Sequence, residues 1–273
     1  MKKLLTLTLT VLMVLTAIFG LTACQKDPVS DVDYIKNKGT LVVGITLYKP
    51  MDWLDEDSGE WIGFDADMAN KLGEKLDVTV QFVVIKWANK VAELKSKNID
   101  CIWNGMTATA ELDANIDFSC SYAENRQVAV VKTENLNTYN SVNAIKTASI
   151  AVEQGSAGDI EATNTVQGTN INRVKDQVGA LTEVASGNSQ VALIDLTMAQ
   201  SVVGNGAYAG LSIVDINTVS FGQEEFAVGV RTGSNLAAEI NALFKETYTD
   251  GTLATLATKY GGIALNTAKL GAL

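Results

Sequence analysis

Continuous apolar runs that alternate with helical patterns constrain the fold of this chain most strongly. The first run is LVVGI at residues 41–45, as expected of a strand that is covered on both faces of a sheet. From Asp65 onward apolar side chains recur every four positions, which predicts a helix with Asp65 as its cap. Further strands are expected at 78–83 and 99–103, with a second helix between them. Strands that alternate with helices over short connections predict parallel pairing and the α/β fold class.

A second series of the same kind begins after Arg126. It contains three expected strands, at 128–131, 148–152 and 191–194, and expected helices from 159 and over 178–185. The chain then returns with an expected strand at 226–230 and two helices, at 235–247 and 253–260. The pattern therefore predicts two α/β units, the second inserted into the first.

The sequence contains no histidine among its 273 residues. This excludes the Ser-His-Asp and Cys-His arrangements of hydrolases and every histidine-based metal site. The three cysteines (Cys24, Cys101 and Cys120) lack the number and spacing of a four-thiolate zinc site. The formal charge is −10, and no lysine or arginine cluster stands out beyond Lys2 and Lys3, which argues against a nucleic-acid partner. Neither a metal nor a cofactor is expected.

The first two dozen residues predict an export signal. Two lysines precede an apolar run that ends at Phe19 and is shorter than the roughly 20 residues that a bilayer requires. Residues 21–24, LTAC, resemble the lipobox of bacterial lipoproteins, whose cysteine is lipidated and becomes N-terminal after cleavage. We therefore expect a signal peptide at 1–23, a lipid anchor at Cys24, a flexible tether over 24–37, and a location on the outer face of the bacterial cell membrane. An unmodified Cys24 is the alternative.

Five segments, in order along the chain, resemble one family, the solute-binding proteins of bacterial ABC importers for polar amino acids. They are GFDADMA at 63–69, IDCIWNGMTAT at 99–109, IDFS at 116–119 with Tyr122, EEFAVGVR at 224–231, and DGT at 250–252. They are similar to the family's GFDxDLA helix start, its D-x-x-x-x-G-x-T-x-T segment, its DFSxxY stretch, its return strand and its tail turn. The resemblance covers about residues 38–262.

The resemblance implies a two-lobed periplasmic-binding-protein fold of type II, with the ligand in the cleft between the lobes. Lobe 1 would be discontinuous, formed by residues 38–124 and 224–273, and lobe 2 would span 127–220. Two hinge strands, at about 122–127 and 221–225, would join them. Closure of such lobes around a ligand makes its presence visible to a membrane partner.

The resemblance also implies the main ligand contacts. Asp195 ends an apolar strand and matches the family's ammonium-binding aspartate, although a solvated aspartate or a helix cap is the alternative. Tyr48 and Trp87 match the aromatic rings that enclose the ligand, where packing in the core is the alternative.

Three neighbouring residues of lobe 1 and one turn of lobe 2 complete this set. Gly105 and Thr107 match the family's lobe 1 contacts, and Asn104 adds an amide beside them. Ser156 lies in the turn that begins the first helix of lobe 2, where free N–H groups favour a carboxylate, and it can also cap that helix.

One departure from the family concerns the ligand's carboxylate. The family usually places an arginine shortly after T-x-T, where this chain has Leu112. Arg126 could compensate or could form a surface salt bridge, and Met51 and Glu153 are less certain contacts. A site made of aromatic walls, Asp195 and Glu153 could also accept an amine that has no carboxylate.

Two alternatives are open for Cys101 and Cys120, whose segments the family's fold brings close. An exported protein permits a disulfide between them, and buried free thiols are the other interpretation.

The sequence thus predicts the substrate-binding lipoprotein of an ABC importer, which captures a small polar ligand, in the first place an amino acid, and delivers it to a membrane permease. A monomer without catalytic activity is expected. A binding protein for a carboxylate-free amine and a chemosensory binding subunit are the alternatives, and a dehydratase-like enzyme would have only Glu153 as its proton-transferring acid. Because no histidine is present, ligand affinity is expected to vary little between about pH 5.5 and 8.

Overall fold

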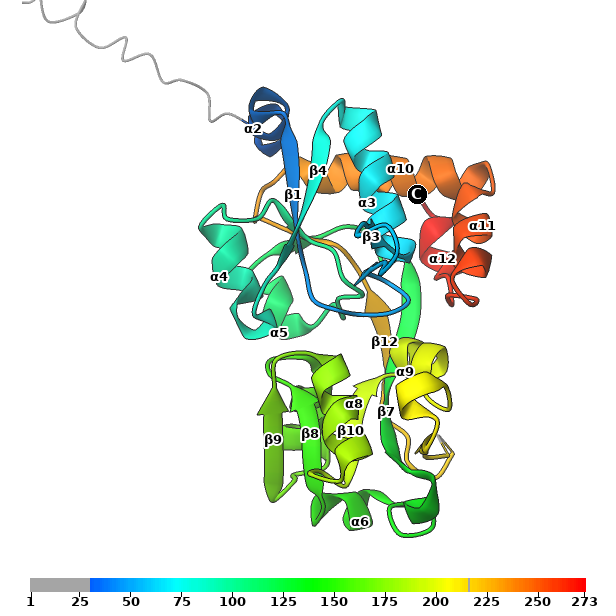
Figure 1. Ribbon diagram of the computed structural model, residues 1–273. Helices are drawn as coiled ribbons and strands as arrows, with labels where there is room; N and C mark the ends of the chain where they lie inside the picture. The colour runs from blue at the N-terminus through cyan, green and yellow to red at the C-terminus, as the bar shows by residue number, and fades with distance from the viewer. Residues whose placement is uncertain (1–29, 216) are drawn as a thin grey trace, which may run out of the picture. The chain divides into compact units, whose positions relative to one another are not determined.

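The computed structural model describes residues 30–215 and 217–273, in which the chain builds two α/β lobes around separate sheets (Figure 1). The predicted signal peptide and the Cys24 anchor lie outside the described residues. In the part of the chain that is described, no helix is both long enough and apolar enough to cross a membrane.

The sheet of lobe 1 has the strand order β4-β1-β5-β13-β6. Its strands are β1 (Thr40–Ile45), β4 (Thr79–Val84), β5 (Cys101–Ile102), β6 (Asp117–Phe118) and β13 (Gly229–Val230). β1 pairs in parallel with β4 and β5, as the sequence pattern predicts, whereas β13 is antiparallel to both of its neighbours. The returning chain therefore completes the first sheet.

The sheet of lobe 2 has the order β11-β7-β10-β8-β9. Its strands are β7 (Ala123–Lys132), β8 (Ser149–Glu153), β9 (Asn170–Val174), β10 (Val191–Asp195) and β11 (Leu211–Ile213). β10, β8 and β9 are parallel, so the carboxyl ends of these strands meet at one edge of the sheet. β8 and β10 end at Glu153 and Asp195, which places both carboxylates at that edge.

Two antiparallel strands connect the lobes. β7 begins beside β12 (Gln223–Phe226), with Ala123 opposite Phe226 and Arg126 opposite Gln223. Figure 1 shows both strands running between the two sheets. The single strand expected at 226–230 is therefore two strands, β12 and β13.

The helices lie between these strands in chain order. They are α2 (Asp31–Lys38), α3 (Phe64–Leu76), α4 (Lys90–Lys95), α5 (Ala110–Asp113), α6 (Val142–Lys146), α7 (Ala157–Ile160), α8 (Gln177–Ser186), α9 (Leu196–Val202), α10 (Leu236–Thr249), α11 (Thr252–Lys259) and α12 (Thr267–Leu270). Short turns of helix are η1 (Trp87–Asn89), η2 (Thr133–Asn135), η3 (Glu161–Thr165) and η4 (Gly206–Tyr208), and a small hairpin pairs β2 (Trp53–Leu54) with β3 (Trp61–Ile62).

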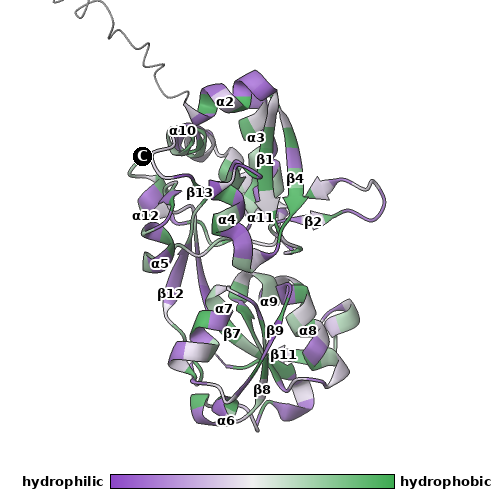
Figure 2. Ribbon diagram, turned by 90° about the vertical axis from the view of Figure 1, so that its left-hand side faces the viewer, coloured by the Kyte–Doolittle hydropathy of each residue, from purple (hydrophilic) through white to green (hydrophobic). Residues whose placement is uncertain are grey.

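Aromatic packing fills the centre of lobe 1 between its sheet and its helices. The rings of Tyr122 and Phe244 stack with centroids 5.1 Å apart, and Trp103 meets Phe244 edge-on at 5.7 Å. Figure 2 shows hydrophobic colours on β1 and β8, a hydrophilic β12, and mixed colours on the helices. Each lobe therefore has an apolar interior beneath amphipathic helices.

The start of α3 explains why glycine precedes Asp65. Gly63 has φ of 136°, and a Cβ atom at this position would lie 2.0 Å from the Met51 carbonyl oxygen. Only glycine fits such a close approach. Gly63, rather than Asp65, is the residue at the N-cap of α3, so the prediction that Asp65 caps this helix is wrong.

The prediction of a flexible tether is wrong from Asp31 onward, because Asp31–Lys38 form the packed helix α2. Val32 and Ile35 are three positions apart, so they share one helix face, and both are buried. Asp31 also forms an ion pair of 2.9 Å with Arg231. Two apolar residues at helical spacing are enough to dock a segment whose composition is otherwise polar.

Of the two alternatives for Cys101 and Cys120, the structure has free thiols and no disulfide. Cys101 lies fully buried in β5, and Cys120, which follows β6, is partly buried; both are free thiols. β13 lies between β5, which holds Cys101, and β6, which ends two residues before Cys120, so a strand separates the two segments. A disulfide requires Cα atoms closer than about 7 Å. Burial raises the pKa of the Cys120 thiol to about 11 and that of Cys101 further, which keeps both thiols protonated.

Replacement of Ile35 by alanine tests the packing of α2. We expect Ile35→Ala to lower the free energy of unfolding by about 2–4 kcal/mol, because the change leaves a cavity under the helix. Urea denaturation measures this loss, and Lys36→Ala, at an exposed position of the same helix, serves as the control with a change within about 0.5 kcal/mol. Equal effects of the two substitutions would show that α2 is not packed.

Candidate functional site

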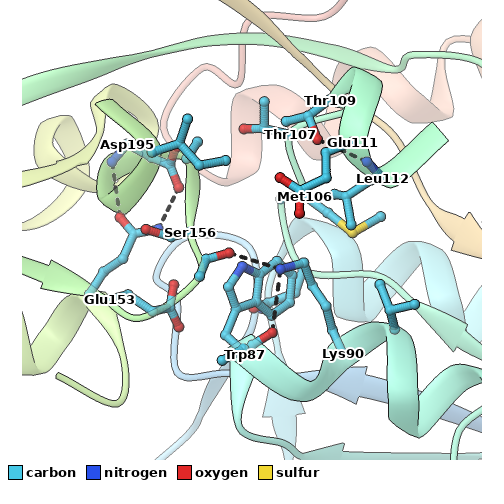
Figure 3. Close-up of a pocket in the computed structure, with 18 of the residues that line it drawn as sticks. Trp87, Lys90, Met106, Thr107, Thr109, Glu111, Leu112, Glu153, Ser156 and Asp195 are labelled. Carbon is cyan, nitrogen blue, oxygen red and sulfur yellow. Dashed lines mark hydrogen bonds between the residues drawn. The ribbon is translucent and has the colours of Figure 1, made fainter. Parts of the chain in front are cut away.

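A cavity of about 380 Å³ lies between the two lobes and is lined by residues of both. This volume suits a ligand of amino-acid size. Figure 3 shows the lining residues, with Trp87, Lys90 and Thr107 from lobe 1 and Glu153, Ser156 and Asp195 from lobe 2.

Most of the residues that the sequence indicates line this cavity together. They are Tyr48, Trp87, Asn104, Gly105, Thr107, Glu153, Ser156 and Asp195. Met51 and Arg126 are not among the lining residues. Met51 is fully buried beneath Gly105, and Arg126 lies on β7 between Asn125 and Gln127, whose side chains bond to Asp195. Because side chains alternate along a strand, Arg126 points to the opposite side.

Three side-chain amides hold the Asp195 carboxylate. Its Oδ1 accepts hydrogen bonds of 2.6 Å from Asn125 and of 2.6 Å from Gln127, and its Oδ2 accepts one of 2.5 Å from Gln177. Its own backbone N–H donates to Gln177 Oε1 at 3.0 Å. Burial raises the pKa of Asp195, and the amide hydrogen bonds act against that rise. Within the described residues no lysine or arginine forms an ion pair with it, so its charge is left for a ligand.

A second carboxylate, Glu224 on β12, uses the same two amides of β7. Its Oε2 accepts from Asn125 and Gln127 at 2.9 Å each, and from Thr107 Oγ1 at 3.1 Å. Burial, followed by the negative charge of Asp195, raises the pKa of Glu224 to about 7. This finding opposes the expectation that binding is insensitive to pH, because a carboxyl group next to the site titrates near neutrality without any histidine.

Two further buried carboxyl groups support the lobe 1 wall of the cavity from below. Asp65 Oδ2 accepts from the Gly105 N–H at 2.6 Å and from the Tyr122 hydroxyl at 2.8 Å. Asp52 Oδ2 accepts from Asn104 Nδ2 at 2.7 Å. Burial raises the pKa of Asp65 to about 7 and that of Asp52 well above its usual range.

Gly105 itself occupies a position that only glycine can fill. Its φ is 52°, and an added Cβ would lie 2.7 Å from Cε1 of Tyr48. The backbone therefore comes close to an aromatic wall of the cavity, held there by Asp65.

The amides that hold Asp195 were missed by the sequence analysis, as was Lys90 among the lining residues. Lys90 is 6% exposed, and its Nζ donates to the carbonyl oxygens of Gly155 at 2.9 Å and Trp87 at 3.4 Å. The Nζ also lies 4.9 Å from the centroid of the Trp87 ring. Burial lowers the pKa of Lys90 to about 8. Lys90 follows Trp87 by three residues at the start of a helical segment, so the two side chains share one face. This spacing is the signal that could have identified Lys90.

Among the described residues that line the cavity, Lys90 is the one basic side chain. Leu112, which stands where the family usually has an arginine, lines the cavity too. The hydrogen bond from Lys90 to Gly155 joins lobe 1 to lobe 2 directly. An ammonium group has three N–H donors, so one remains after the two bonds to carbonyl oxygens. This donor can meet a ligand carboxylate in place of the arginine that Leu112 replaces.

Ser156 caps the helix α7. Its Oγ accepts from the Asp159 N–H at 3.2 Å, which confirms the capping interpretation. Ser156 also lines the cavity, and its expected contact with a ligand carboxylate stays a prediction. In residues 30–215 and 217–273, no three or more acidic or cysteine side chains are grouped so that they could hold a metal ion.

Comparison with known proteins extends these observations. A family model described as bacterial extracellular solute-binding proteins, family 3, matches residues 41–263. The L-cystine-binding protein TcyJ of Escherichia coli K12 is 27% identical over 229 residues, which cover 84% of this chain and 85% of TcyJ. The arginine-binding extracellular protein ArtP of Bacillus subtilis is 27% identical over 249 residues, which cover 89% of this chain and 92% of ArtP.

A solved structure has the same architecture. It is the substrate-binding protein of an ABC uptake transporter from Streptococcus pneumoniae with bound histidine. The TM-score is 0.78 at 28% sequence identity, and the match covers 86% of this chain and 98% of that one. Three relatives at nearly equal identity thus carry three different amino acids in their names, so similarity alone does not select a ligand.

The raised pKa of Glu224 predicts how stability depends on pH. The folded protein holds this proton up to about pH 7, whereas the unfolded chain loses it near pH 4.5, so the folded state loses stability as pH rises through this window. We expect the free energy of unfolding of Glu224→Gln to lose about 3 kcal/mol less than that of the wild type over this pH range. Unfolding free energies measured at intervals from pH 4.5 to 7.5 test this.

The control is Glu56→Gln, at an exposed position in the turn between β2 and β3, which should reproduce the wild-type profile. If the free energy of unfolding of Glu224→Gln fell with pH as steeply as that of the wild type, a titration of Glu224 near neutrality would be contradicted.

Proposed function

Because the chain belongs to the bacterial extracellular solute-binding proteins, family 3, we propose that it is the substrate-binding component of an ABC importer and that its ligand is an amino acid. One observation carries this proposal. A buried carboxylate, Asp195, is fixed by three amides at the edge of an interlobe cavity and has no cationic partner among the described residues. Such a group is preorganised for an ammonium ion.

The ligand's α-ammonium group would bind to Asp195, and its carboxylate would take the remaining N–H of Lys90. Tyr48 and Trp87 would cover the ligand from lobe 1, with Thr107 and the Gly105 backbone beside them. Each end of the amino acid would thus meet a group of opposite charge, in a cavity from which bulk water is largely excluded.

Binding would be coupled to closure of the lobes. Asp195 belongs to lobe 2 and Lys90 to lobe 1, so a ligand that bridges them would favour the arrangement in which the lobes approach. β7 and β12 would serve as the hinge strands. The closed form would then be the one that a membrane permease recognises, with no chemical change in the ligand.

Export and anchoring belong to the same proposal. The LTAC segment at residues 21–24 and the extracellular character of the family support a monomeric lipoprotein held at the outer face of the cell membrane by Cys24. A chemosensory subunit would use the same site, and its partner would differ.

Lys90 favours an amino acid over a carboxylate-free amine as the ligand. The apolar Leu112 alone would leave the carboxylate without a cation, but Lys90 supplies one in the same cavity. An enzymatic role for Glu153 has no comparable support, because the relatives are named as binding proteins.

The first test is Asp195→Asn. We expect this variant to bind the best amino-acid ligand at least 100-fold more weakly, because an amide cannot neutralise a buried ammonium group. A thermal-shift screen of the purified protein against the twenty amino acids finds the ligand, and isothermal titration calorimetry measures the loss. Asp57→Asn, an exposed change of the same kind, is the control. Unchanged affinity in Asp195→Asn would remove the ammonium site from the proposal.

The second test uses Lys90→Met and a matched pair of ligands, the best amino acid and the amine that lacks only its carboxylate. We expect the variant to bind the amino acid at least 10-fold more weakly than the wild type does. Its affinity for the amine should fall much less, because only the amino acid loses an ion pair. The comparison within the pair corrects for the lost bond to Gly155. Equal losses for both ligands would contradict a carboxylate-binding role of Lys90.

A further inference from the structure

A second buried carboxylate, Glu153, lines the cavity, and the proposed binding of an amino acid's two charged main-chain groups does not use it. Glu153 is the last residue of β8 and is 2% exposed. Its Oε1 is buried and has no hydrogen-bond partner among the described residues. Buried polar atoms are nearly always paired, so an unpaired oxygen in a binding cavity indicates a group that a ligand completes.

No cation of the protein fills this role within the described residues. Lys90 is the basic side chain of the cavity, but its Nζ bonds to the carbonyl oxygens of Trp87 and Gly155 and forms no ion pair with Glu153. An unpaired buried carboxylate is costly, and a partner of opposite charge removes much of that cost.

Acidic side chains outnumber basic ones among the described residues that line the cavity. Three lining side chains are acidic (Glu111, Glu153 and Asp195), and one, Lys90, is basic. A zwitterionic amino acid adds one positive and one negative charge and leaves this imbalance unchanged. A ligand with an additional cationic nitrogen reduces it.

Glu153 lies beside Asp195 at the edge of the lobe 2 sheet but on a different strand. Glu153 ends β8 and Asp195 ends β10, which are adjacent parallel strands, so the two carboxylates enter the cavity from neighbouring points on one sheet edge. The aliphatic side chains of Val91 and Ile160 also line the cavity and suit the methylene groups of a ligand.

We infer that Glu153 binds a second cationic nitrogen of the ligand, so that the substrate is an amino acid with an ammonium or guanidinium group on its side chain. This inference rests on the proposed function, because it assigns the far end of a ligand whose α-ammonium group Asp195 holds. Glu153 is then the residue that selects among amino acids.

Proton release provides a readout that a structural role of Glu153 would not produce. Burial, followed by the negative charges of Asp195 and Asp176, raises the pKa of Glu153, and Lys90 and a hydrogen bond with Thr46 act in the opposite direction. A ligand cation beside the carboxylate lowers that pKa again, so binding drives a proton off Glu153. A neutral side chain in the same place has no such effect.

The experiment compares ligands of matched shape by isothermal titration calorimetry on the purified protein. The pairs are L-arginine with L-citrulline, whose side chain is nearly isosteric but uncharged, and L-lysine with L-norleucine. We expect the wild type to bind the charged member of at least one pair 10-fold or more tightly than the neutral member. In Glu153→Gln this ratio should fall below threefold, mainly through weaker binding of the charged ligand.

Three controls accompany this comparison. Glu153→Asp keeps the carboxylate and should retain a ratio above threefold, which separates the loss of charge from a failure to fold. Glu56→Gln, an exposed change, should keep the wild-type ratio. Titrations in buffers of different ionisation enthalpy should detect more proton release for the charged ligand than for the neutral one, and this difference should vanish in Glu153→Gln.

Two results would overturn the inference and leave the proposed function intact. One is equal wild-type affinity within both pairs. The other is an equal loss of both members in Glu153→Gln, which would mean that Glu153 shares the α-ammonium group with Asp195. If no amino acid binds to the wild type at all, the proposed function fails instead.

Discussion

The interaction on which the site depends is the binding of the Asp195 carboxylate by the amides of Asn125, Gln127 and Gln177. Two of these amides belong to β7, which runs between the lobes, and the third opens α8. The same two amides of β7 bind Glu224 on β12, the other connecting strand. The group that would hold a ligand is thereby bonded directly to β7, and the same two amides of β7 link it to β12.

This arrangement concentrates buried carboxyl groups with few local cations. Glu153, Asp195 and Glu224 lie near one another in lobe 2 and β12, and Asp52 and Asp65 lie behind the lobe 1 wall. Their burial raises their pKa values, so the folded protein carries protons that an exposed carboxyl group would release. A ligand's positive charge would exchange with these protons, which gives pH a role in a protein without histidine.

Much of this structure could be predicted from local patterns. Apolar runs gave the parallel strands, and the carboxylates that end β8 and β10 were visible as acidic residues after such runs. The resemblance to solute-binding proteins indicated Tyr48 and Trp87, and its segment at 99–109 indicated Asn104, Gly105 and Thr107, all of which line one cavity. The fold and most of the candidate site therefore follow from periodicity and motif order.

The remainder depends on contacts that the sequence does not display. Asp65 has the position of a helix cap, but a close approach of Met51 makes Gly63 the N-cap and sends the Asp65 carboxylate to Gly105. Lys90 looks like an ordinary surface lysine until its helix is seen to face Gly155 across the cavity. Cys101 and Cys120 appear close in the fold until β13 is found between β5, which holds Cys101, and β6, which precedes Cys120.

A crystal structure of the protein with its best-binding amino acid tests the central claim most directly. The account predicts that the ligand lies in the interlobe cavity, with its α-ammonium nitrogen about 3 Å from an Asp195 oxygen and its carboxylate at Lys90 Nζ. A ligand bound outside this cavity, or one whose carboxylate faces Asp195, would contradict it.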